Sequence, residues 1–440
     1  MKIIMGKTEK ILSGAELLRK IGTTVRIPGM VHKVREMGGF AFIVLRTGNG
    51  LCQCVYAAEK ARFKLEDVPE GAAVVFEGEV KKEERAAAGF ELHLTGAEVL
   101  SKPAAGLPLV VNKKKLDASL DSSLFYRPLA LRNPRERAIF RIQEGLVRGF
   151  REYLFEQGFT EIRTPKIVSA GAEGGANIFK IDYFGREAYL AQSPQFYKQM
   201  MVGVFQRVFE AGPVYRAEKH NTARHLNEYV SMDYEMGFIR DFTDVMEMET
   251  GLMRFLFTFL KEEYGSELEM LETELPSIEG IPAMKFIEAK KILREIYGKK
   301  KSDPYDFDPL EEQLICRYAR ENFCAEFIFI THYPEKKRPF YAMDDPSEPG
   351  YTKSFDLLFR GLEITTGGQR IHDYQMQVEK MIKKGLNPSN FESYLMIHKY
   401  GMPPHGGLGI GLERLTMRLL GLQNIRQACL FPRDTGRLTP

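Results

Sequence analysis

The sequence predicts an α+β protein with a small all-β domain at its N-terminal end and a larger mixed domain after it. The chain has 440 residues, of which 44% are hydrophobic, which is enough for two or three domains with their own cores. Residues 22–101 contain short alternating segments separated by turn signals. Later residues show helical and strand patterns together, without an internal repeat.

Composition limits the classes of function. The 62 basic and 59 acidic residues leave a net charge of only +3, so nucleic-acid binding would have to rest on local patches and base contacts. The five cysteines form no CxxC pair and have no histidine at zinc-ligand spacing, which predicts reduced thiols and no structural metal. No run reaches membrane-spanning length and no leader is evident. We therefore expect a cytoplasmic protein without a membrane partner.

The first predicted domain covers residues 1–105. Five strand-like segments in so short a stretch suggest a barrel, and the OB-fold is the most common barrel of this size. Cys52 and Cys54 alternate with Gln53 and fit a position in the barrel core. The five segments read TTVRIPGMVHKV, GFAFIVLRTGNG, LCQCVYAA, GAAVVFEGEVKK and GFELHLTGAEVL.

Residues 106–132 mix proline, lysine and serine with little periodicity, which predicts a linker. The second domain is expected over residues 133–440. Its first helix is predicted from Ala138 to Gly158, and a strand follows in FTEIRTPKIV. The apolar face of that helix is formed by Ile139, Ile142, Leu146, Phe150 and Leu154.

A charged hairpin follows in residues 208–239. The segments VFEAGPVYRAEKHN and LNEYVSMDYEMGFI alternate polar and apolar side chains, which predicts two antiparallel strands joined around EKHNTARH. Arg216 and Glu218 are expected to share a face of the first strand. On the second strand one face is expected to carry Tyr229, Ser231, Asp233 and Glu235. A solvated sheet face with surface ion pairs is the ordinary interpretation of such a pattern.

The C-terminal segment HGGLGIGLERLTMRLLGL predicts a glycine-spaced strand that runs into an amphipathic helix. Glu413 and Arg414 stand at the junction. Glycines would let a ligand approach the backbone closely, but such turns occur in many folds. The segment is not a dinucleotide-binding fingerprint, because the required βαβ unit is missing.

Three segments, FRIQEGLVRGFREYLFEQGFTEIRTPKI, YRAEKHNTARHLNEYVSMDYEM and GIGLERL, resemble in order and form the signature motifs of class II aminoacyl-tRNA synthetases. The segments LAQSPQFYKQMM, SFDLLFRGLEITTGGQRIHDY and YGMPPHGGLGIGLERL are similar to the aspartyl branch of that family, and the first domain resembles its anticodon-binding OB-fold. The resemblance implies ATP-dependent attachment of L-aspartate to tRNA(Asp) through an aspartyl-adenylate. It also implies a mainly antiparallel catalytic sheet flanked by helices.

The resemblance carries further expectations about assembly and lineage. The helix and strand ending at Pro165 would form a two-fold homodimer interface. The short spacing between the second motif and SFDLL leaves no room for the large extra domain of the usual bacterial form, so the chain is similar to the archaeal and eukaryotic type.

The resemblance assigns ATP binding to a set of residues around the second and third motifs. Arg216 would hold the α-phosphate and the substrate carboxylate through its bidentate fork, although a surface pair with Glu218 is the alternative. Tyr229 and Arg414 would enclose the adenine. The full ATP set is Arg216, Glu218, His220, Arg224, His225, Tyr229, Glu363, Gly411 and Arg414. Among them the catalytic residues would be Arg216, Glu218 and Arg414.

Magnesium is implied as the cofactor that accompanies ATP, and it prefers oxygen ligands that leave room for phosphates. By resemblance its ligands would be Asp356, Glu363 and Thr366, with Thr366 standing where a serine is common. The alternative for Glu363 is a purely structural acid.

The aspartate site is implied in a pocket with two cations, which suit a carboxylate and disfavour asparagine. Lys198 taken alone could be an ordinary lysine on a helix surface, and the loop that carries Glu173 could be a simple connection. The full set is Glu173, Ser193, Gln195, Lys198, Asp233 and Arg370.

Anticodon contacts are implied on the barrel, where Phe42 would stack on a base while Arg35 and Gln53 read base edges. A position for Phe42 in the barrel core is the alternative. His32 stands where tRNA(Asp)-specific archaeal forms commonly carry tryptophan, and it motivates the hypothesis that tRNA(Asn) is also charged. The product on tRNA(Asn) would then need a tRNA-dependent amidotransferase as partner.

Other functions remain open at this point. The chain could be strictly specific for tRNA(Asp), or it could be an asparaginyl- or lysyl-specific relative. A non-catalytic RNA-binding paralogue is the alternative from another class of protein.

Overall fold

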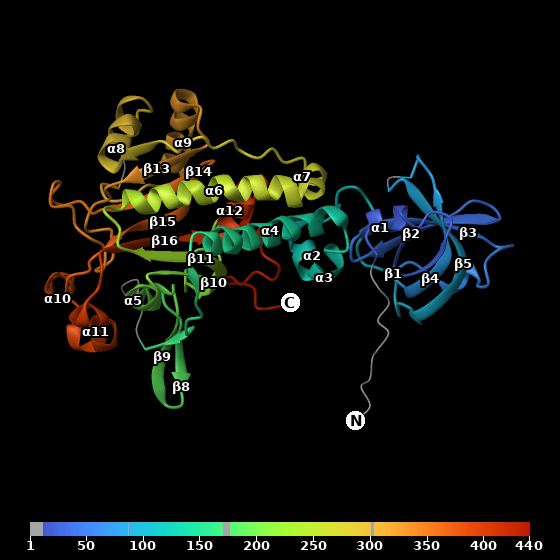
Figure 1. The fold of residues 1–440 in the computed structure, drawn as a ribbon, viewed down its shortest axis with the longest axis horizontal. Helices are drawn as coiled ribbons and strands as arrows, with labels where there is room; N and C mark the ends of the chain where they lie inside the picture. Colours follow the sequence, from blue (N-terminus) through green and yellow to red (C-terminus); the bar gives the residue numbers. More distant parts are fainter. Residues whose placement is uncertain (1–11, 87, 170–176, 301–302) are drawn as a thin grey trace. The chain divides into compact units, whose positions relative to one another are not determined.

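The computed structural model describes residues 12–86, 88–169, 177–300 and 303–440 (Figure 1). The chain divides into two compact units, Met1–Glu136 and Arg137–Pro440. Among the described residues, no helix combines the length and the apolar character that a membrane crossing requires.

The first unit contains a closed five-stranded barrel in the order β1-β2-β3-β5-β4. Its strands alternate between core and surface, and Ala41, Ile43 and Leu45 are fully buried. Cys52 and Cys54 also lie in the core, as predicted. The elements are α1 (Gly14–Leu18), β1 (Thr24–Glu36), β2 (Phe40–Thr47), β3 (Gly50–Ala57), η1 (Leu65–Asp67), β4 (Ala73–Lys82) and β5 (Phe90–Ser101).

Two short helices lie within the predicted linker, α2 (Leu120–Phe125) and α3 (Arg127–Ala130). Ser119 caps α2 because its Oγ accepts a hydrogen bond from the backbone N–H of Ser122 at 3.2 Å. Helices of this length contain too few turns to produce a recognisable apolar period.

The second unit is built on an eight-stranded sheet in the order β12-β13-β14-β15-β16-β11-β10-β6. Neighbouring strands are antiparallel except for the pairs β12–β13 and β6–β10 at its two edges. The α+β class and the mainly antiparallel sheet are therefore as expected. The strands are β6 (Thr160–Glu161), β10 (Arg207–Tyr215), β11 (Glu228–Gly237), β12 (Ala283–Lys285), β13 (Phe327–Thr331), β14 (Ser354–Phe359), β15 (Leu362–Arg370) and β16 (His405–Gly411).

A smaller sheet has the order β7-β9-β8, with β7 (Ile167–Val168), β8 (Lys180–Tyr183) and β9 (Arg186–Leu190). The remaining helices of this unit are α4 (Pro134–Glu156), which begins just before it, α5 (Gln195–Phe205), α6 (Thr243–Glu263), α7 (Gly265–Leu271), α8 (Phe286–Glu295), α9 (Pro309–Phe323), α10 (Tyr374–Lys383), α11 (Glu392–Tyr400) and α12 (Leu412–Leu419). Two 3₁₀ turns complete it, η2 (Pro388–Phe391) and η3 (Ile425–Ala428).

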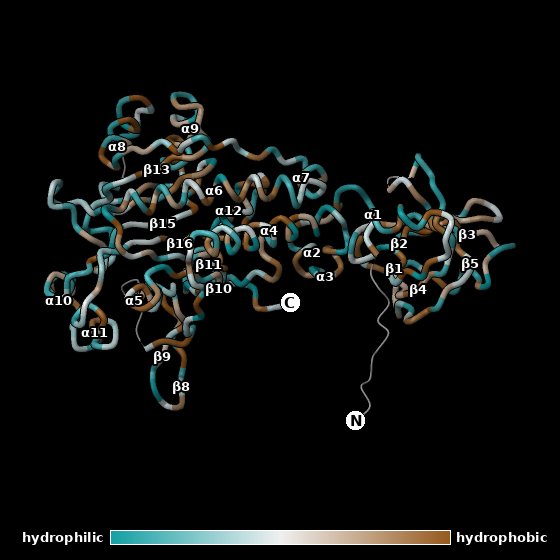
Figure 2. The backbone as a smooth tube through the Cα atoms, viewed as in Figure 1, coloured by the Kyte–Doolittle hydropathy of each residue, from teal (hydrophilic) through white to brown (hydrophobic). Residues whose placement is uncertain are grey.

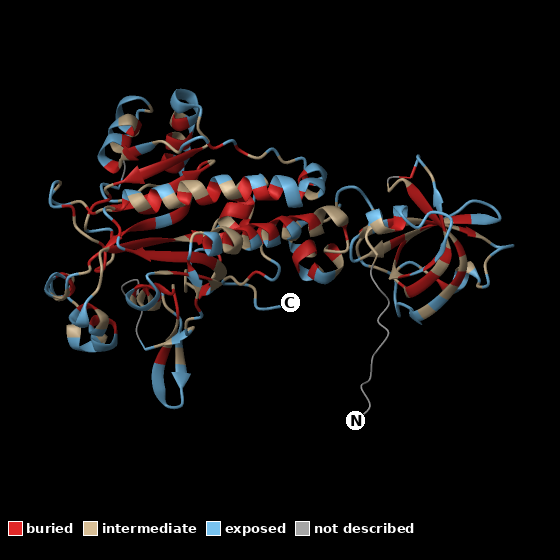
Figure 3. Cartoon of the chain, in the orientation of Figure 1, coloured by how far each residue is buried: buried red, intermediate tan, exposed pale blue. Residues whose placement is uncertain are grey.

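The main core lies between one face of the large sheet and the helices α4 and α6. Met232 and Tyr234 of β11 pack into this core with Leu408 of β16. Figure 2 shows hydrophilic and hydrophobic residues interspersed along α6, and Figure 3 shows the sheet strands as largely buried. The polar side chains that alternate with these apolar residues consequently point to the opposite face.

The helix α4, the first one predicted for the second domain, begins earlier than Ala138. Asn133 Oδ1 accepts hydrogen bonds from the backbone of Arg135 at 3.0 Å and Glu136 at 3.3 Å, and Pro134 occupies the first helical position. The predicted strand after Gly158 is broken into β6 and β7, and Pro165, which has no N–H to donate, lies in the gap.

The hairpin forms as predicted, but its first strand ends at Tyr215. Arg216 and Glu218 therefore lie in the loop that connects the strands, and their expected position on a strand face is wrong. The interpretation of the second strand as a solvated face is also wrong, because Asp233 is only 3% exposed and Glu235 is 0% exposed. A second layer of structure must cover this polar face.

Glu249 on α6 gives a prediction about stability. The residue is 0% exposed, and neither carboxylate oxygen has a hydrogen-bond partner among the described residues. Burial raises its pKa to about 8, above the ordinary value of about 4.3 that it has in the unfolded chain. The unfolded chain releases this proton first, so stability is greatest below the unfolded pKa and falls as the pH rises toward about 8.

We expect Glu249→Gln to become progressively more stable than the parent between pH 5 and pH 8. The difference should widen by up to about 1.4 kcal/mol per pH unit, as one pKa unit is worth that amount. Urea unfolding across this range measures it. Glu247→Gln, an exposed change on the same helix, is the control. Parallel pH profiles for Glu249→Gln and the parent would contradict the prediction.

Candidate active site

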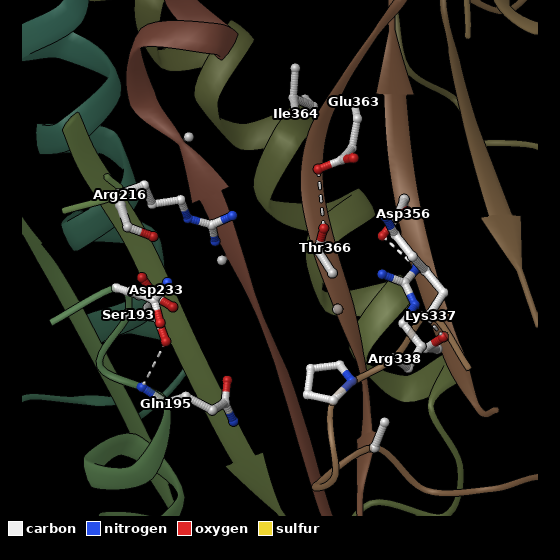
Figure 4. Close-up of a pocket in the computed structure, with 18 of the residues that line it drawn as sticks. Ser193, Gln195, Arg216, Asp233, Lys337, Arg338, Asp356, Glu363, Ile364 and Thr366 are labelled. Atoms are coloured by element: carbon white, nitrogen blue, oxygen red, sulfur yellow. Dashed lines mark hydrogen bonds and ion pairs between the residues drawn. The ribbon is translucent and has the colours of Figure 1, made fainter. Parts of the chain in front are cut away.

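A cavity of about 570 Å³ lies in the second unit, over the polar face of β11. Its size is in the range of small-ligand sites. Figure 4 shows Arg216 and Asp233 on one side and Glu363, Thr366, Asp356 and Arg338 on the other. The sequence-predicted residues that line it are Ser193, Gln195, Lys198, Arg216, Glu218, Arg224, His225, Tyr229, Asp233, Asp356, Glu363, Thr366, Arg370, Gly411 and Arg414.

The glycines of β16 make room for the acids of β11. Asp233 is paired with Gly409 and Glu235 with Gly407 in the sheet register. A Cβ atom on Gly407 would lie 2.3 Å from Oε2 of Glu235, and one on Gly409 would lie 2.9 Å from Oδ1 of Asp233. Both distances are too short for real contacts, and the Cβ atom on Gly407 would also lie 2.2 Å from the backbone carbonyl oxygen of Tyr234. The glycine spacing is therefore required by the backbone and the carboxylates of the neighbouring strand together.

Lys198 of α5 is buried beside these acids, with 2% of its surface exposed. Its Nζ lies 2.9 Å from Asp233 Oδ1, 2.8 Å from the carbonyl oxygen of Leu408 and 3.4 Å from Glu235 Oε2. The alternative of a lysine on a helix surface is therefore wrong.

Arg370 of β15 approaches the same acids from the neighbouring strand. Its Nε donates to Glu235 Oε1 at 2.9 Å, and its Nη2 donates to the carbonyl of Gly407 at 2.9 Å. Burial alone would raise the pKa of Glu235, but the charges of Arg370 and Lys198 hold that pKa below its usual value. Sequence reasoning did not include Glu235 among the site residues, although the alternation Tyr229, Ser231, Asp233, Glu235 pointed to it.

This end of the cavity is electrically balanced, because two buried cations face two buried carboxylates. The expectation of a pocket dominated by two cations is thus incomplete. Asp233 keeps its Oδ2 buried without a hydrogen-bond partner among the described residues. A ligand that carries both an ammonium and a carboxylate would suit such a surface.

A buried chain of amides supports Gln195. Its Nε2 donates to Oε1 of Gln199 at 2.9 Å, and Nε2 of Gln199 lies 2.9 Å from Nε2 of His405. His405 Nδ1 lies 2.9 Å from the carbonyl of Pro403. Since a carbonyl only accepts, Nδ1 carries the proton and Nε2 accepts from Gln199. Burial lowers the pKa of His405 to about 4, so the ring is neutral at physiological pH.

The other end of the cavity is formed by the connecting loop, β15 and α12. Arg414 Nη1 donates to the carbonyl oxygen of Glu363 at 3.1 Å and lies 3.4 Å from its Oε1. The neighbouring Glu413 is buried, and its carboxylate accepts from the backbone N–H of Val230 at 3.1 and 3.2 Å. This contact fixes the start of α12 against β11, close to Tyr229.

The residues of the connecting loop that were predicted to bind ATP do not all face the cavity. Arg224 Nη2 donates to the two carboxylate oxygens of Glu312 at 2.7 and 2.9 Å, a partner on α9 that sequence reasoning missed. His225 Nε2 lies 3.4 Å from Glu218 Oε2. His220 is exposed and does not line the cavity, so its role stays a prediction. Glu173 falls outside the described residues.

The predicted metal ligands lie together on β14 and β15. Asp356 and Thr366 are opposite each other in the register, and Thr366 Oγ1 donates to Glu363 Oε1 at 3.2 Å. Arg338, which sequence reasoning missed, pairs with Asp356 at 2.7 Å. Burial raises the pKa of Asp356 to about 6 in spite of this arginine.

Within the part of the chain that the structure describes, no group of three or more acidic, histidine or cysteine side chains forms a complete metal cage. Two carboxylates and a hydroxyl on one cavity wall instead fit Mg²⁺. That ion usually takes one or two carboxylates together with substrate phosphates and waters. The donor set thus fits a metal that arrives with a nucleotide.

The predicted anticodon residues lie on the barrel of the first unit. Arg35 is opposite Phe42, which is opposite Val55, and Gln53 lies two residues before Val55 on the same face. Phe42 is half-buried between the core residues Ala41 and Ile43, so its side chain faces outward and the core alternative is wrong. Gln53 Nε2 donates to Glu91 at 2.6 Å.

His32 differs from these residues. The β1–β2 register shifts between Val31 and Lys33, which places His32 at a β-bulge. The bulge leaves both Val31 and His32 buried, at 2% and 7% exposure. Any influence of His32 on a bound base would therefore pass through the shape of β1 and not through an open ring surface.

Comparisons with known proteins agree with this arrangement. Residues 25–100 match the family described as OB-fold nucleic acid binding domain. The chain is 46% identical to an aspartate–tRNA(Asp/Asn) ligase of Deinococcus radiodurans over 97% of this chain and 98% of that protein. It is 43% identical to an aspartate–tRNA(Asp) ligase of Pyrococcus abyssi over 95% of this chain and 97% of that protein.

Solved structures are similar over the whole chain. Asparaginyl-tRNA synthetase from Pyrococcus horikoshii with asparaginyl-adenylate superposes with a TM-score of 0.90 at 31% identity, over 98% of this chain and 100% of that one. Aspartyl-tRNA synthetase from Entamoeba histolytica gives 0.84 at 32% identity, over 100% and 96%. Residues 119–435 match the family described as tRNA synthetases class II (D, K and N), and the chain belongs to that family.

Proposed function

We propose that this chain attaches L-aspartate to tRNA(Asp) and tRNA(Asn) in an ATP-dependent reaction that passes through aspartyl-adenylate. The observation that carries the amino-acid choice is the buried cluster of Lys198, Asp233, Glu235 and Arg370 at one end of the cavity. Two relatives at 46% identity are named aspartate–tRNA(Asp/Asn) ligases, and their names support the wider tRNA range.

Aspartate fits the cluster as a zwitterion with one extra carboxylate. Its ammonium would take the unpartnered Oδ2 of Asp233, with Gln195 and Ser193 nearby on the cavity wall. Its side-chain carboxylate would take Lys198 and Arg370, which Glu235 holds in place. Asparagine would present an amide N–H₂ to these donors, and sites built on buried polar pairing discriminate by about 10⁴ or more.

Activation joins the α-carboxylate of aspartate to the α-phosphorus of ATP and releases pyrophosphate. Arg216 would bridge these groups, while Tyr229 and Arg414 hold the adenine from its two faces and Arg224, His225, His220 and Glu218 hold the remainder of the nucleotide. Bringing the reactants together in this way supplies much of the acceleration. A ribose hydroxyl of the tRNA then attacks the adenylate carbonyl, and AMP leaves.

Magnesium would be held by Asp356, Glu363 and Thr366. It supplies positive charge beside the ATP phosphates, which these acids would otherwise repel. Glu173, which lies outside the described residues, is proposed as a further contact to aspartate.

The asparaginyl alternative is supported by the fold likeness to asparaginyl-tRNA synthetases. Amino-acid-dependent ATP–pyrophosphate exchange separates the two proposals. We expect exchange with aspartate and background rates with asparagine and lysine. Exchange that is stronger with asparagine would overturn the aspartate assignment. If none of the three amino acids supports exchange, a non-catalytic RNA-binding protein would be favoured.

The barrel is proposed as the anticodon-binding domain, with residues 106–132 as its linker to a catalytic domain at 133–440. Phe42 offers a half-exposed ring between the strands that carry Arg35 and Gln53. Phe40 meets it edge-on at 5.6 Å between ring centroids. Such a surface suits an unstacked base.

Phe42→Ala should raise the KM for tRNA by about 10- to 100-fold, because base–aromatic stacking is worth about 1–3 kcal/mol per base. Aspartate-dependent ATP–pyrophosphate exchange should be unchanged, since that reaction needs no tRNA. The control is Phe63→Ala, a partly buried barrel phenylalanine packed on the core. A barrel that is merely loosened would respond to both substitutions alike, and that result would contradict the stacking role.

The proposal extends to partners. Charging of tRNA(Asn) with aspartate would require an amidotransferase that converts the product. The long helix α4 with β6 is proposed as the homodimer interface, which sedimentation of the full chain tests, and the site of action is proposed to be the cytoplasm.

A further inference from the structure

A second cavity, of about 480 Å³, lies in the second unit where α9, α12 and the turn between β14 and β15 meet. Its volume is within the range of ligand pockets. Four of its lining residues are arginines, Arg317, Arg320, Arg360 and Arg418, and the one acidic residue that lines it is Glu326. A concave surface with this composition carries a strong positive potential.

Arg360 and Glu326 neutralise each other's charge. Arg360 forms an ion pair with Glu326 and donates to the carbonyls of Leu419 at 3.0 Å and Glu274 at 3.3 Å. Its φ of +44° and the φ of +82° at Gly361 place both central residues of the turn in the left-handed region, where asparagine and glycine are usual. An arginine held there fixes the C-terminal end of α12 beside the turn.

The other three arginines face the cavity without a carboxylate. Among the described residues, no hydrogen bond or ion pair joins a side chain to the guanidinium of Arg317, Arg320 or Arg418. Gln313, Arg317 and Arg320 follow helical spacing and share one face of α9. Arg418 approaches from α12, and its Nε is buried without a hydrogen-bond partner.

Burial and the nearby charge of Arg224 lower the pKa of Arg418, and the charge of Glu312 offsets this effect only in part. A guanidinium stays charged in proteins in spite of such a shift. Three guanidinium groups that line one cavity without a paired carboxylate would therefore be stabilised by a bound anion.

The geometry points to a second anion site that binds a phosphate group, separate from the active-site cavity. Planar guanidinium forks match phosphate oxygens bidentately, and three of them suit a group with several oxygens. The amide of Gln313 adds a neutral donor on the same face. The phosphate could belong to a free polyphosphate or to the backbone of bound RNA.

The site adjoins the nucleotide wall without being part of it. Gln313 follows Glu312, the partner of Arg224, and Arg418 lies one helical turn after Arg414. Gly361 stands two residues before Glu363. The helices α9 and α12 and the β14–β15 turn region thus contribute different side chains to the two cavities. The ion pair between Arg224 and Glu312 belongs to the active-site cavity.

The test measures binding of inorganic tripolyphosphate by titration calorimetry to the full chain saturated with a non-hydrolysable ATP analogue. The variant is Arg317→Gln with Arg320→Gln, two exposed changes that leave Arg360 and Arg418 intact. The matched control is Arg240→Gln with Arg294→Gln, which removes the same charge from two other exposed positions. A second arm measures tRNA binding against salt concentration.

We expect the Arg317/Arg320 variant to bind tripolyphosphate at least about tenfold more weakly, because two guanidinium groups would no longer donate charge-assisted hydrogen bonds to the phosphate. If the phosphate comes from RNA, the same variant should bind tRNA more weakly and lower the slope of log K against log salt by about two. The control should match the parent in both arms.

Unchanged binding in both arms, or equal losses in the two double variants, would overturn the proposal. The comparison needs no aminoacylation, and the ATP analogue serves only to fill the active-site cavity in the parent and in both double variants. The anion site can therefore fail while the proposed function stands, and the reverse also holds. Thermal unfolding of both double variants verifies that they fold.

Discussion

Lys198→Met should reduce kcat/KM for aspartate in ATP–pyrophosphate exchange by at least about 10³-fold, the size of effect expected when a buried charged hydrogen-bonding group is lost from a specificity pocket. Methionine fills a similar volume but donates no hydrogen bond. Asp233 and Glu235 would then meet the substrate carboxylate with one cation, Arg370, instead of two. Repulsion from these acids adds to the loss of the direct contact.

The matched control is Lys166→Met, which removes a partly buried lysine 3.1 Å from Glu210 outside the cavity. It should leave exchange close to the parental rate. The KM for ATP should be nearly unchanged in Lys198→Met, since the nucleotide residues lie at the other end of the cavity. Exchange within tenfold of the parent in a folded Lys198→Met protein would refute the aspartate pocket as assigned.

Arg216→Lys should slow adenylate formation by about 10²- to 10³-fold, because removing one preorganised donor from a developing negative charge costs about that much. Lysine keeps the charge but loses the fork that would span two oxygens at once. The effect should fall on the rate of the chemical step more than on the KM for aspartate. Single-turnover formation of aspartyl-adenylate measures it.

Arg207→Lys is the control for this change. Arg207 begins β10, the strand that leads to Arg216, and its Nη1 donates to the carbonyl of Gln157 at 2.9 Å, away from the cavity. It should form adenylate at the parental rate. If Arg216→Lys does so as well, Arg216 does not stabilise the reacting phosphate.

Local patterns in the sequence predicted a large part of this architecture. Strand alternation over residues 22–101 gave the barrel, and the apolar period from Ile139 to Leu154 gave α4. The alternation through Tyr229, Ser231 and Asp233 placed those side chains on one face. These features succeed because each depends on neighbours within a few residues of chain.

Features that depend on distant segments were not predictable in the same way. Glu235, Arg338 and Glu312 acquire their roles only when other segments of the chain bring a group of opposite charge beside them. The requirement for Gly407 arises from the backbone of Tyr234 and the carboxylate of Glu235, which lie on the next strand of the sheet but far away in the sequence. The spacing of apolar and polar residues along one segment does not indicate contacts of this kind.

Local irregularities were also hidden. The β-bulge at His32 adds one residue to β1 and buries a side chain that strict alternation would leave outside. The early start of α4 depends on Asn133, which caps the helix before Pro134. This pair of residues is a helix-start signal in the sequence, but it lies before the apolar period on which the prediction relied.

In the proposed function, this cavity activates aspartate and the enzyme transfers it to two tRNAs. The most direct test is the charging of separate tRNA(Asp) and tRNA(Asn) transcripts with labelled aspartate, with labelled asparagine and lysine as controls. We predict aspartate on both transcripts and background levels of the other two amino acids. Aspartate on tRNA(Asp) alone would contradict the relaxed tRNA range, and asparagine on tRNA(Asn) would contradict the pocket itself.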